Sequence, residues 1–273
     1  MTGSETARMR AVEDAAEKEA PAHRGRFSPS HTETFRIFDN DCDMNHLLTP
    51  RGGMRLAQQM ATDHCTSAGM DADFYERTRT AWVVVRSALA WTRVPHADEE
   101  LTITTRPEAH RRGMCKRITE FHDARGNEIG LMDARWVLVN TEDRSIYRHL
   151  PESYGWVAFN ESIDRELRVR IPRKLEGTYV RSVHAGFSYC DANGHVNNTR
   201  YADLICDALP DDAMRDATLK SLAISFEHEI PYGSDFDLTR LRLEDGSWYV
   251  SGDQNGAHCF EGIATLAPCA AYA

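Results

Sequence analysis

Three side chains that can take part in acid–base chemistry lie within one short segment. Asp191, Asn193 and His195 supply a carboxylate, a carboxamide and an imidazole, and Gly194 separates the last two. Glycine permits the tight backbone turn that can aim such groups toward one point. The segment therefore has the makings of part of an active site, although an Asx turn before a capped helix uses the same residue types.

The residues after this loop predict a helix that ends before Pro210. Asn197 or Asn198 is expected to be its N-cap. The unpaired amides at its start would favour negative charge nearby, so they are candidates for an oxyanion site. Apolar residues recur at helical spacing at Tyr201, Leu204, Ile205 and Ala208.

A degraded copy of the loop occurs earlier in the chain. Residues 42–47 read like residues 190–196 without the glycine, and each loop precedes an amphipathic helix and an apolar strand. The repeat covers half of the chain, which is longer than the period of a solenoid. We therefore predict two versions of one folding unit. Asp43, Asn45 and His46 have lost the spacing of the second loop, so we predict one active site per chain.

The remaining pattern predicts a long first helix, from Thr49 and Pro50 to Gly69, and antiparallel strands in both units. One helix followed by antiparallel strands can be covered only if the sheet curls around it, which is an α+β arrangement. The expected strands are residues 34–37, 82–91, 101–105, 114–121 and 128–139, then 182–189, 222–230, 236–243, 248–251 and 259–266.

The string from Asp191 to Tyr201 resembles the Asp-x-Asn-x-His-Val-Asn-Asn segment of the acyl-acyl-carrier-protein (acyl-ACP) thioesterases. The resemblance implies an α+β double (tandem) hotdog fold with two long helices, each wrapped by a curved antiparallel sheet. We expect a charged N-terminal tail at 1–30, an N-terminal hotdog unit with the acyl cavity at 31–150, a linker at 151–179 and a catalytic C-terminal hotdog unit at 180–273.

The resemblance also implies a catalytic glutamate on the strand after the second helix, and Glu229 aligns with it. Glu227 would lie on the same face of that strand, so the pattern does not choose between them. Some relatives have a cysteine directly after the glutamate, but this chain has Ile230, so no mechanism that needs that thiol can operate. The expected catalytic residues are Asp191, Asn193, His195 and Glu229.

No residue has the setting of a covalent nucleophile. The chain has no Gly-x-Ser-x-Gly motif, and the charge of Asp191 would disfavour a thiolate at Cys190. We therefore expect attack by water, activated by Glu229, with Asn193 positioning the water or the thioester oxygen and His195 polarising the reacting groups. Asp191 would hold the loop and the histidine.

The function implied by the resemblance is hydrolysis of fatty acyl thioesters in fatty acid biosynthesis, with acyl carrier protein as the partner. An acyl-CoA thioesterase, a hotdog enoyl-thioester hydratase and a non-catalytic acyl-thioester-binding module are the alternatives. The hydratases carry a segment that resembles Asp-x-Asn-Pro-x-His, whereas in this chain the proline is missing and the histidine comes one residue early. No cofactor or metal is expected, since the seven cysteines lack paired metal-ligand spacing.

A cluster of four cations, Arg111, Arg112, Lys116 and Arg117, lies within seven residues of an acidic chain. Such a cluster could steer an acidic carrier protein toward the cavity. It could equally protect a solvated hairpin edge from pairing with other strands.

Composition narrows the class of protein further. The net charge of −10 argues against a general nucleic-acid binder, and no apolar stretch is long enough for a membrane span. The first thirty residues contain neither a signal-peptide core nor an acid-poor transit peptide, so we expect a cytoplasmic protein. Two fused units can satisfy hotdog pairing internally, which leaves both a monomer and a homodimer open.

Overall fold

The computed structural model describes residues 27–157 and 159–269, so most of the predicted N-terminal tail lies outside the described residues. The helices are α2 (Pro50–Ser67), α3 (Ala72–Thr78), α4 (Arg200–Ala208) and α5 (Asp211–Arg215). The strands are β1 (His31–Arg36), β2 (Thr80–Trp91), β3 (Glu100–Pro107), β4 (Cys115–His122), β5 (Glu128–Asn140), β6 (Thr178–His184), β7 (Ala217–Phe226), β8 (Asp235–Arg242), β9 (Trp248–Gln254) and β10 (Ala257–Pro268).

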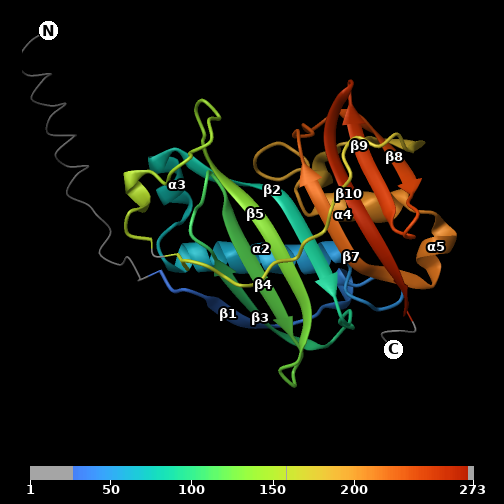
Figure 1. The fold of residues 1–273 in the computed structure, drawn as a ribbon, viewed down its shortest axis with the longest axis horizontal. Coiled ribbons are helices and arrows are strands. Elements are labelled where there is room, and N and C mark those ends of the chain that lie inside the picture. Colours follow the sequence, from blue (N-terminus) through green and yellow to red (C-terminus); the bar gives the residue numbers. More distant parts are fainter. Residues whose placement is uncertain (1–26, 158, 270–273) are drawn as a thin grey trace, which may run out of the picture.

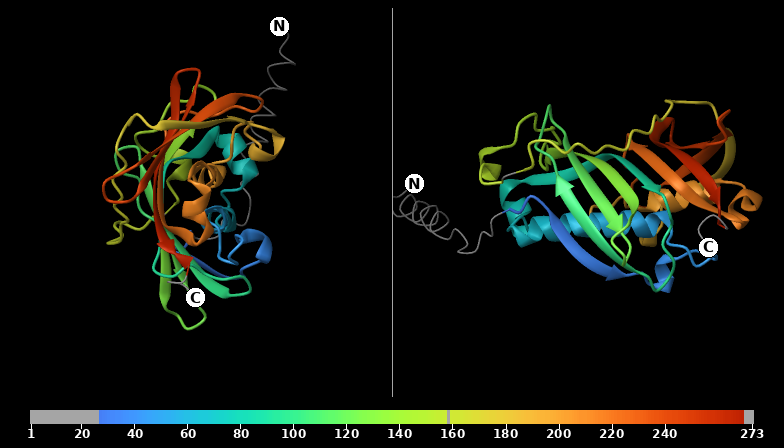
Figure 2. Two further views of the ribbon diagram at one scale, coloured as in Figure 1. Left: turned by 90° about the vertical axis from the view of Figure 1, so that its right-hand side faces the viewer. Right: turned by 60° about the horizontal axis from the view of Figure 1, so that its bottom comes forward.

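These strands form one sheet in the order β1-β3-β4-β5-β2-β7-β10-β9-β8-β6 (Figure 1). The first five belong to one unit and the last five to the other, and the antiparallel pairing of β2 with β7 joins them. Both α2 and α4 lie on the same side of the sheet (Figure 2). The tandem hotdog fold is confirmed, with the two half-sheets continuous rather than separate.

The first helix begins where the sequence predicts. Thr49 is the N-cap of α2, with its hydroxyl accepting a hydrogen bond from the Gly52 amide at 3.0 Å, and Pro50 is the first helical residue. The second helix, α4, ends before Pro210 as the sequence predicts, but with nine residues against eighteen for α2 it is not the second long helix that the resemblance implies. None of the helices within the described ranges is long and apolar enough to cross a membrane.

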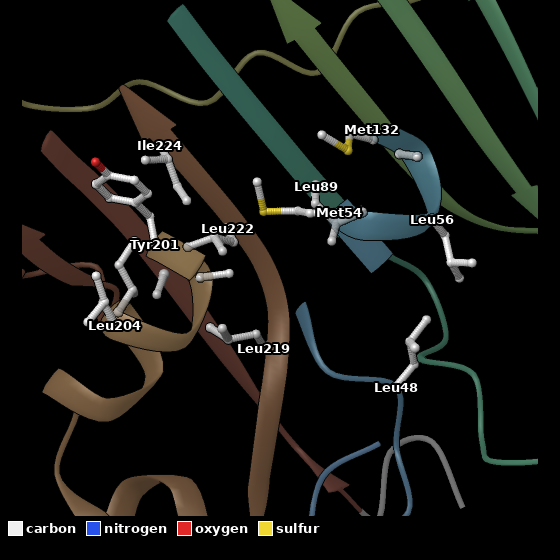
Figure 3. Packing of buried hydrophobic residues seen from close by; sticks show 14 of the residues in the cluster. Leu48, Met54, Leu56, Leu89, Met132, Tyr201, Leu204, Leu219, Leu222 and Ile224 are labelled. Carbon is white, nitrogen blue, oxygen red and sulfur yellow. The ribbon is translucent and has the colours of Figure 1, made fainter. Parts of the chain in front are cut away.

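The two units share one buried apolar cluster. Figure 3 shows Met54 of α2 close to Leu89 and Met132 of the first half-sheet, and Tyr201 of α4 beside Leu222. Because the core is continuous across the β2–β7 junction, burial of apolar surface fixes the units relative to one another. Residues of one unit can therefore complete a site in the other.

The predicted strand at 182–189 is wrong at its C-terminal end. Strand β6 ends at His184, and Phe187–Tyr189 form a 3-10 helix with Phe187 exposed. The Ala185 amide still donates to the Ser234 carbonyl in the register of the β6–β8 pairing, but the next amide, that of Gly186, turns back to the His184 carbonyl at 2.9 Å and ends the strand. The chain therefore turns before it enters the loop at Asp191.

The predicted strand at 222–230 also ends early. Strand β7 stops at Phe226, because the amides of Glu227 and His228 both donate to the Cys259 carbonyl, at 2.8 and 3.0 Å. Two consecutive donors on one acceptor break the regular ladder with β10. Glu227 and Glu229 therefore lie beyond the strand, and strand alternation does not govern where their side chains point.

Candidate active site

The loop before α4 is built around the side chain of Asp191. Its Oδ1 accepts a hydrogen bond from the Asn193 amide at 2.9 Å, and its Oδ2 accepts one from Asn197 Nδ2 at 3.1 Å. The Asp191 amide donates to the His195 carbonyl at 3.0 Å. Gly194 sits between them at φ +78°, a region that favours glycine. Asp191 therefore orients His195 through the backbone, and no hydrogen bond joins the two side chains.

His195 and Glu229 meet at the surface of this loop. His195 Nε2 lies 3.2 Å from Glu229 Oε2, with the imidazole 25% and the carboxylate 51% exposed. The backbone brings them together, because the Val196 amide donates to the Ile230 carbonyl at 2.9 Å. This contact joins two of the four predicted residues, which lie 34 positions apart in the sequence.

Arg144 of the first unit also reaches this carboxylate, with Nη1 3.2 Å from Glu229 Oε2. The residue lies in the turn after β5, and its guanidinium is 77% exposed. An exposed pair of this kind contributes little to stability, but it places a cation of unit one beside the candidate base of unit two. Sequence reasoning missed Arg144, because residues 140–144 are all polar and have the composition of an ordinary turn.

Glu227, the other candidate base, points elsewhere. Its Oε1 accepts a hydrogen bond from Ser225 Oγ at 2.9 Å, and it lines a separate depression together with His228 and His258. Of the two glutamates that the sequence left open, Glu229 is therefore the one that contacts His195.

The predicted cap of α4 is wrong. Thr199 is the N-cap, and its side chain makes no capping bond. Asn197 instead accepts from the Thr199 amide through Oδ1, at 3.0 Å, and from the Arg200 amide through its carbonyl, at 2.8 Å. Because these amides are already paired, they are poor candidates for the oxyanion site expected at the helix start.

A cavity of about 620 Å³ opens beside the loop. Its walls come mostly from the first unit, from α2, α3 and strands β2, β4 and β5, and the second unit contributes only Ala192 and Asn193. No hydrogen bond holds the Asn193 side chain among the described residues, so its carboxamide is free to meet a ligand at the cavity. The volume falls within the range of small-molecule sites.

The thiol beside the site is not activated. Partial burial, and then the charge of Asp191, raise the pKa of Cys190 above its ordinary value. A thiol with a raised pKa is a poor nucleophile at neutral pH. In the chain apart from residues 1–26, 158 and 270–273, no group of three or more His, Cys, Asp or Glu side chains is arranged to hold a metal ion.

The first unit keeps the loop but not its chemistry. The paired bridges Cys42–Leu48 and Leu47–His96 match Cys190–Val196 and His195–Pro231 of the second unit. In this register His46 takes the place of Gly194, at φ +58°, while Leu47 takes that of His195. On the facing segment His96 matches Pro231, so Val94 takes the place of Glu229, and both Leu47 and Val94 are 1% exposed. The His195–Glu229 pair is thus replaced by two core residues.

Half of the basic segment is internal, whereas Arg111 and Arg112 are exposed. Lys116 forms an ion pair with Glu108 at 2.6 Å, with only 11% and 12% of their side chains exposed, and Arg117 is 8% exposed. Arg111 donates to the Glu161 carbonyl. Two of the four cations therefore cannot form the carrier-steering surface that the sequence suggested.

Arg117 lies against a buried histidine on α2. Its Nη1 is 3.3 Å from His64 Nδ1, and His64 Nε2 is 2.9 Å from the Ser28 carbonyl. Burial, and then the charge of Arg117, lower the pKa of His64 to about 4. The neutral ring therefore donates to Ser28 and accepts from Arg117. His64 is therefore a packed core residue.

The low pKa of His64 predicts acid sensitivity. Below pH 6.5 the unfolded chain binds a proton at this histidine, whereas the folded protein does not until about pH 4. The free energy of unfolding should therefore fall as the pH drops through this window, by roughly 3 kcal/mol from this residue. Urea unfolding from pH 7 to pH 4 measures it. His64→Gln should flatten the slope, and an equally steep loss in that variant would assign it to other groups.

Comparison with known proteins identifies relatives that match most of the chain. It is 25% identical to the chloroplastic oleoyl-acyl carrier protein thioesterase 2 of Arabidopsis thaliana over 244 residues, which are 80% of this chain and 66% of that protein. It is 24% identical to the chloroplastic dodecanoyl-[acyl-carrier-protein] hydrolase of Cinnamomum camphora over 200 residues, 68% of this chain and 50% of that protein. The chain thus spans about half to two thirds of the length of these curated relatives.

Solved structures share the tandem architecture. An acyl-ACP thioesterase from Bacteroides thetaiotaomicron superposes with a TM-score of 0.78 at 21% identity, covering 88% of this chain and 98% of that one. A 12:0-ACP thioesterase from Umbellularia californica gives 0.77 at 18% identity, covering 89% and 99%. The family profile of the acyl-ACP thioesterase N-terminal domain matches residues 28–155, and that of the C-terminal domain matches residues 173–259. The chain therefore belongs to the acyl-ACP thioesterase family.

Proposed function

We propose that this protein hydrolyses fatty acyl-ACP thioesters and releases the free fatty acid. The observation that carries the proposal is the 3.2 Å contact between His195 and Glu229 beside a cavity whose lining includes Asn193. Hydrolysis by water needs a base to take the proton from water and a donor to polarise the thioester carbonyl. The carboxylate, the imidazole and the carboxamide can supply these functions.

In this mechanism Glu229 removes a proton from water as the oxygen forms a bond to the thioester carbon. Asn193 donates from its carboxamide to the carbonyl oxygen, where negative charge develops. Collapse of the tetrahedral intermediate breaks the carbon–sulfur bond, and the proton held by Glu229 passes to the departing thiolate. His195 fixes the carboxylate through Nε2, and Asp191 holds the loop that carries His195.

The two units divide the work in this proposal. The first supplies the cavity for the acyl chain, and the second supplies the reacting groups. The counterparts of His195 and Glu229 in the first unit are Leu47 and Val94, which support this division because neither can transfer a proton.

The function is tested by incubating the protein with acyl-ACP and acyl-CoA thioesters of graded length and measuring free thiol. Faster thiol release from acyl-ACP than from acyl-CoA supports the proposal. Release only from acyl-CoA would show that the carrier is coenzyme A and not acyl carrier protein. A crotonyl thioester distinguishes hydration from hydrolysis, because hydration removes the enoyl absorbance without releasing thiol. Tight binding of acyl-ACP with no thiol release would indicate a binding module instead.

The division between the units makes a prediction about the first loop. The double variant Asp43→Ala with His46→Ala should keep its turnover within about twofold, because neither residue contacts the reacting pair. Asp43 accepts from the Asn45 and Leu47 amides, at 2.8 and 3.1 Å, so some loss of stability is expected. Thiol release is therefore compared at a temperature where circular dichroism shows both proteins folded. A collapse of turnover under those conditions would contradict the single-site scheme.

A further inference from the structure

A small second cavity is surrounded by polar atoms that lack partners. Nine buried side-chain nitrogen or oxygen atoms among the described residues have no hydrogen bond. Four of them belong to residues that line this one cavity: Gln58 Oε1, Ser87 Oγ, Trp136 Nε1 and Asn198 Oδ1. Buried polar groups without partners cost free energy, so their gathering at one point indicates a polar group that they are built to receive.

A buried cation lies at the same place. Arg117 lines the small cavity, is 8% exposed, and forms no ion pair with a carboxylate in the described part of the chain. Its bonds go to neutral groups instead, to Thr105 Oγ1 at 3.2 Å and to His64 Nδ1 at 3.3 Å. A buried charge is normally paired, so an oxygen ligand in this cavity would stabilise it.

The small cavity adjoins the one proposed for the acyl chain. Gln58, Arg117 and Trp136 line both. The centre of a water-sized sphere can move within a volume of about 10 Å³ in this cavity, which is enough for a single oxygen atom. An acyl chain in the larger cavity therefore passes beside a recess of one-oxygen size.

From this arrangement we infer that the preferred substrates are acyl thioesters that carry a hydroxyl group on the chain, with the hydroxyl oxygen in the recess lined by Gln58, Ser87 and Trp136. The inference rests on the proposed thioesterase function and specifies the class of acyl group. An unsubstituted chain would displace water from the shared wall and leave its polar atoms unpaired, whereas a hydroxyl group restores those bonds.

The mixture of donors and acceptors favours a hydroxyl over other oxygen groups. Trp136 Nε1 can only donate, whereas the carboxamides of Gln58 and Asn198 each offer an acceptor and a donor, and the Ser87 hydroxyl does both. A carboxylate has two oxygen atoms, and the cavity has room for only one. A hydroxyl group donates and accepts, so it can pair with both kinds of partner.

The test compares thioesters of equal chain length that are unsubstituted, hydroxylated at C2, C3 or the terminal carbon, or carry a terminal carboxylate. At least one hydroxylated isomer should exceed the unsubstituted chain in kcat/KM by about tenfold or more. If unsubstituted chains are hydrolysed and no hydroxylated isomer exceeds them, the function stands and this inference fails. A preference for the carboxylate would also overturn it.

Variants locate the effect. Ser87→Ala and Trp136→Phe each remove one polar atom and should lower the ratio of kcat/KM for the hydroxylated over the unsubstituted chain by about fivefold or more. Trp248→Phe is the matched control, because Trp248 Nε1 is also buried without a partner but lines neither cavity. Loss of the preference in the control, or its retention in both test variants, would place the hydroxyl elsewhere.

A binding measurement keeps the inference testable without turnover. The ligand is the hydroxylated free fatty acid that matches the preferred thioester. If no thioester is hydrolysed, each hydroxylated isomer is used in turn. It should raise the Tm of the protein more than the unsubstituted acid does. The difference should vanish in Ser87→Ala. Equal shifts for both acids in the unaltered protein would contradict the inference, even if no thioester is hydrolysed.

Discussion

Replacing Glu229 by glutamine is expected to lower kcat by about 10²–10⁴-fold, the usual contribution of a positioned base. The change keeps the size of the side chain and its acceptor oxygen toward His195 but removes the ability to take a proton from water. His195→Ala should have a loss of the same order, because it removes the group 3.2 Å from the base. Single-turnover thiol release measures the chemical step directly.

Glu227→Gln is the matched control for this prediction. Glu227 lies two residues away in the same segment, but its carboxylate accepts from Ser225 instead of facing His195. Its variant should keep full turnover. If Glu227→Gln is inactive and Glu229→Gln is not, the base has been misassigned. If both variants retain turnover, base catalysis by this segment is excluded.

Replacing Lys116 by methionine is expected to lower the free energy of unfolding by about 3 kcal/mol, because it leaves a buried carboxylate without its cation. Lys116 Nζ lies 2.6 Å from Glu108 Oε2 and also donates to the Ile163 carbonyl at 2.7 Å. Burial raises the pKa of Glu108, but the hydrogen bonds from Lys116 and the Ile163 amide lower it by more. The net pKa is below its ordinary value, so the carboxyl stays charged. Urea unfolding at pH 7 measures the loss.

The control is the double variant Lys116→Met with Glu108→Gln. Because the second change neutralises the stranded carboxylate, the double variant should be more stable than Lys116→Met alone. If the double variant is the less stable of the two, the ion pair does not explain the loss. Lys116→Met should also leave the salt dependence of acyl-ACP hydrolysis unchanged, since the ammonium is internal; a weaker dependence would restore the carrier-steering role.

Local signals in the sequence were sufficient for much of the fold. The Thr49-Pro50 start of α2 was predicted correctly, because a cap and an N1 proline act within one turn. The end of β7 was not, because it depends on a distant partner. Strand β7 stops where Glu227 and His228 meet the Cys259 carbonyl, more than thirty residues away in the chain.

The sequence by itself determined the division into two units and the loop from Asp191 to His195, because these follow from short patterns that each half of the chain carries in order, and its resemblance to the acyl-ACP thioesterases implied the tandem hotdog fold. Only the tertiary structure decided that Glu229 rather than Glu227 faces His195, that Arg144 joins them from the other unit, and that Arg117 lies inside. The physical reason is that a side chain's surroundings depend on strand ends and on the packing of the two units, which no window of neighbouring residues encodes.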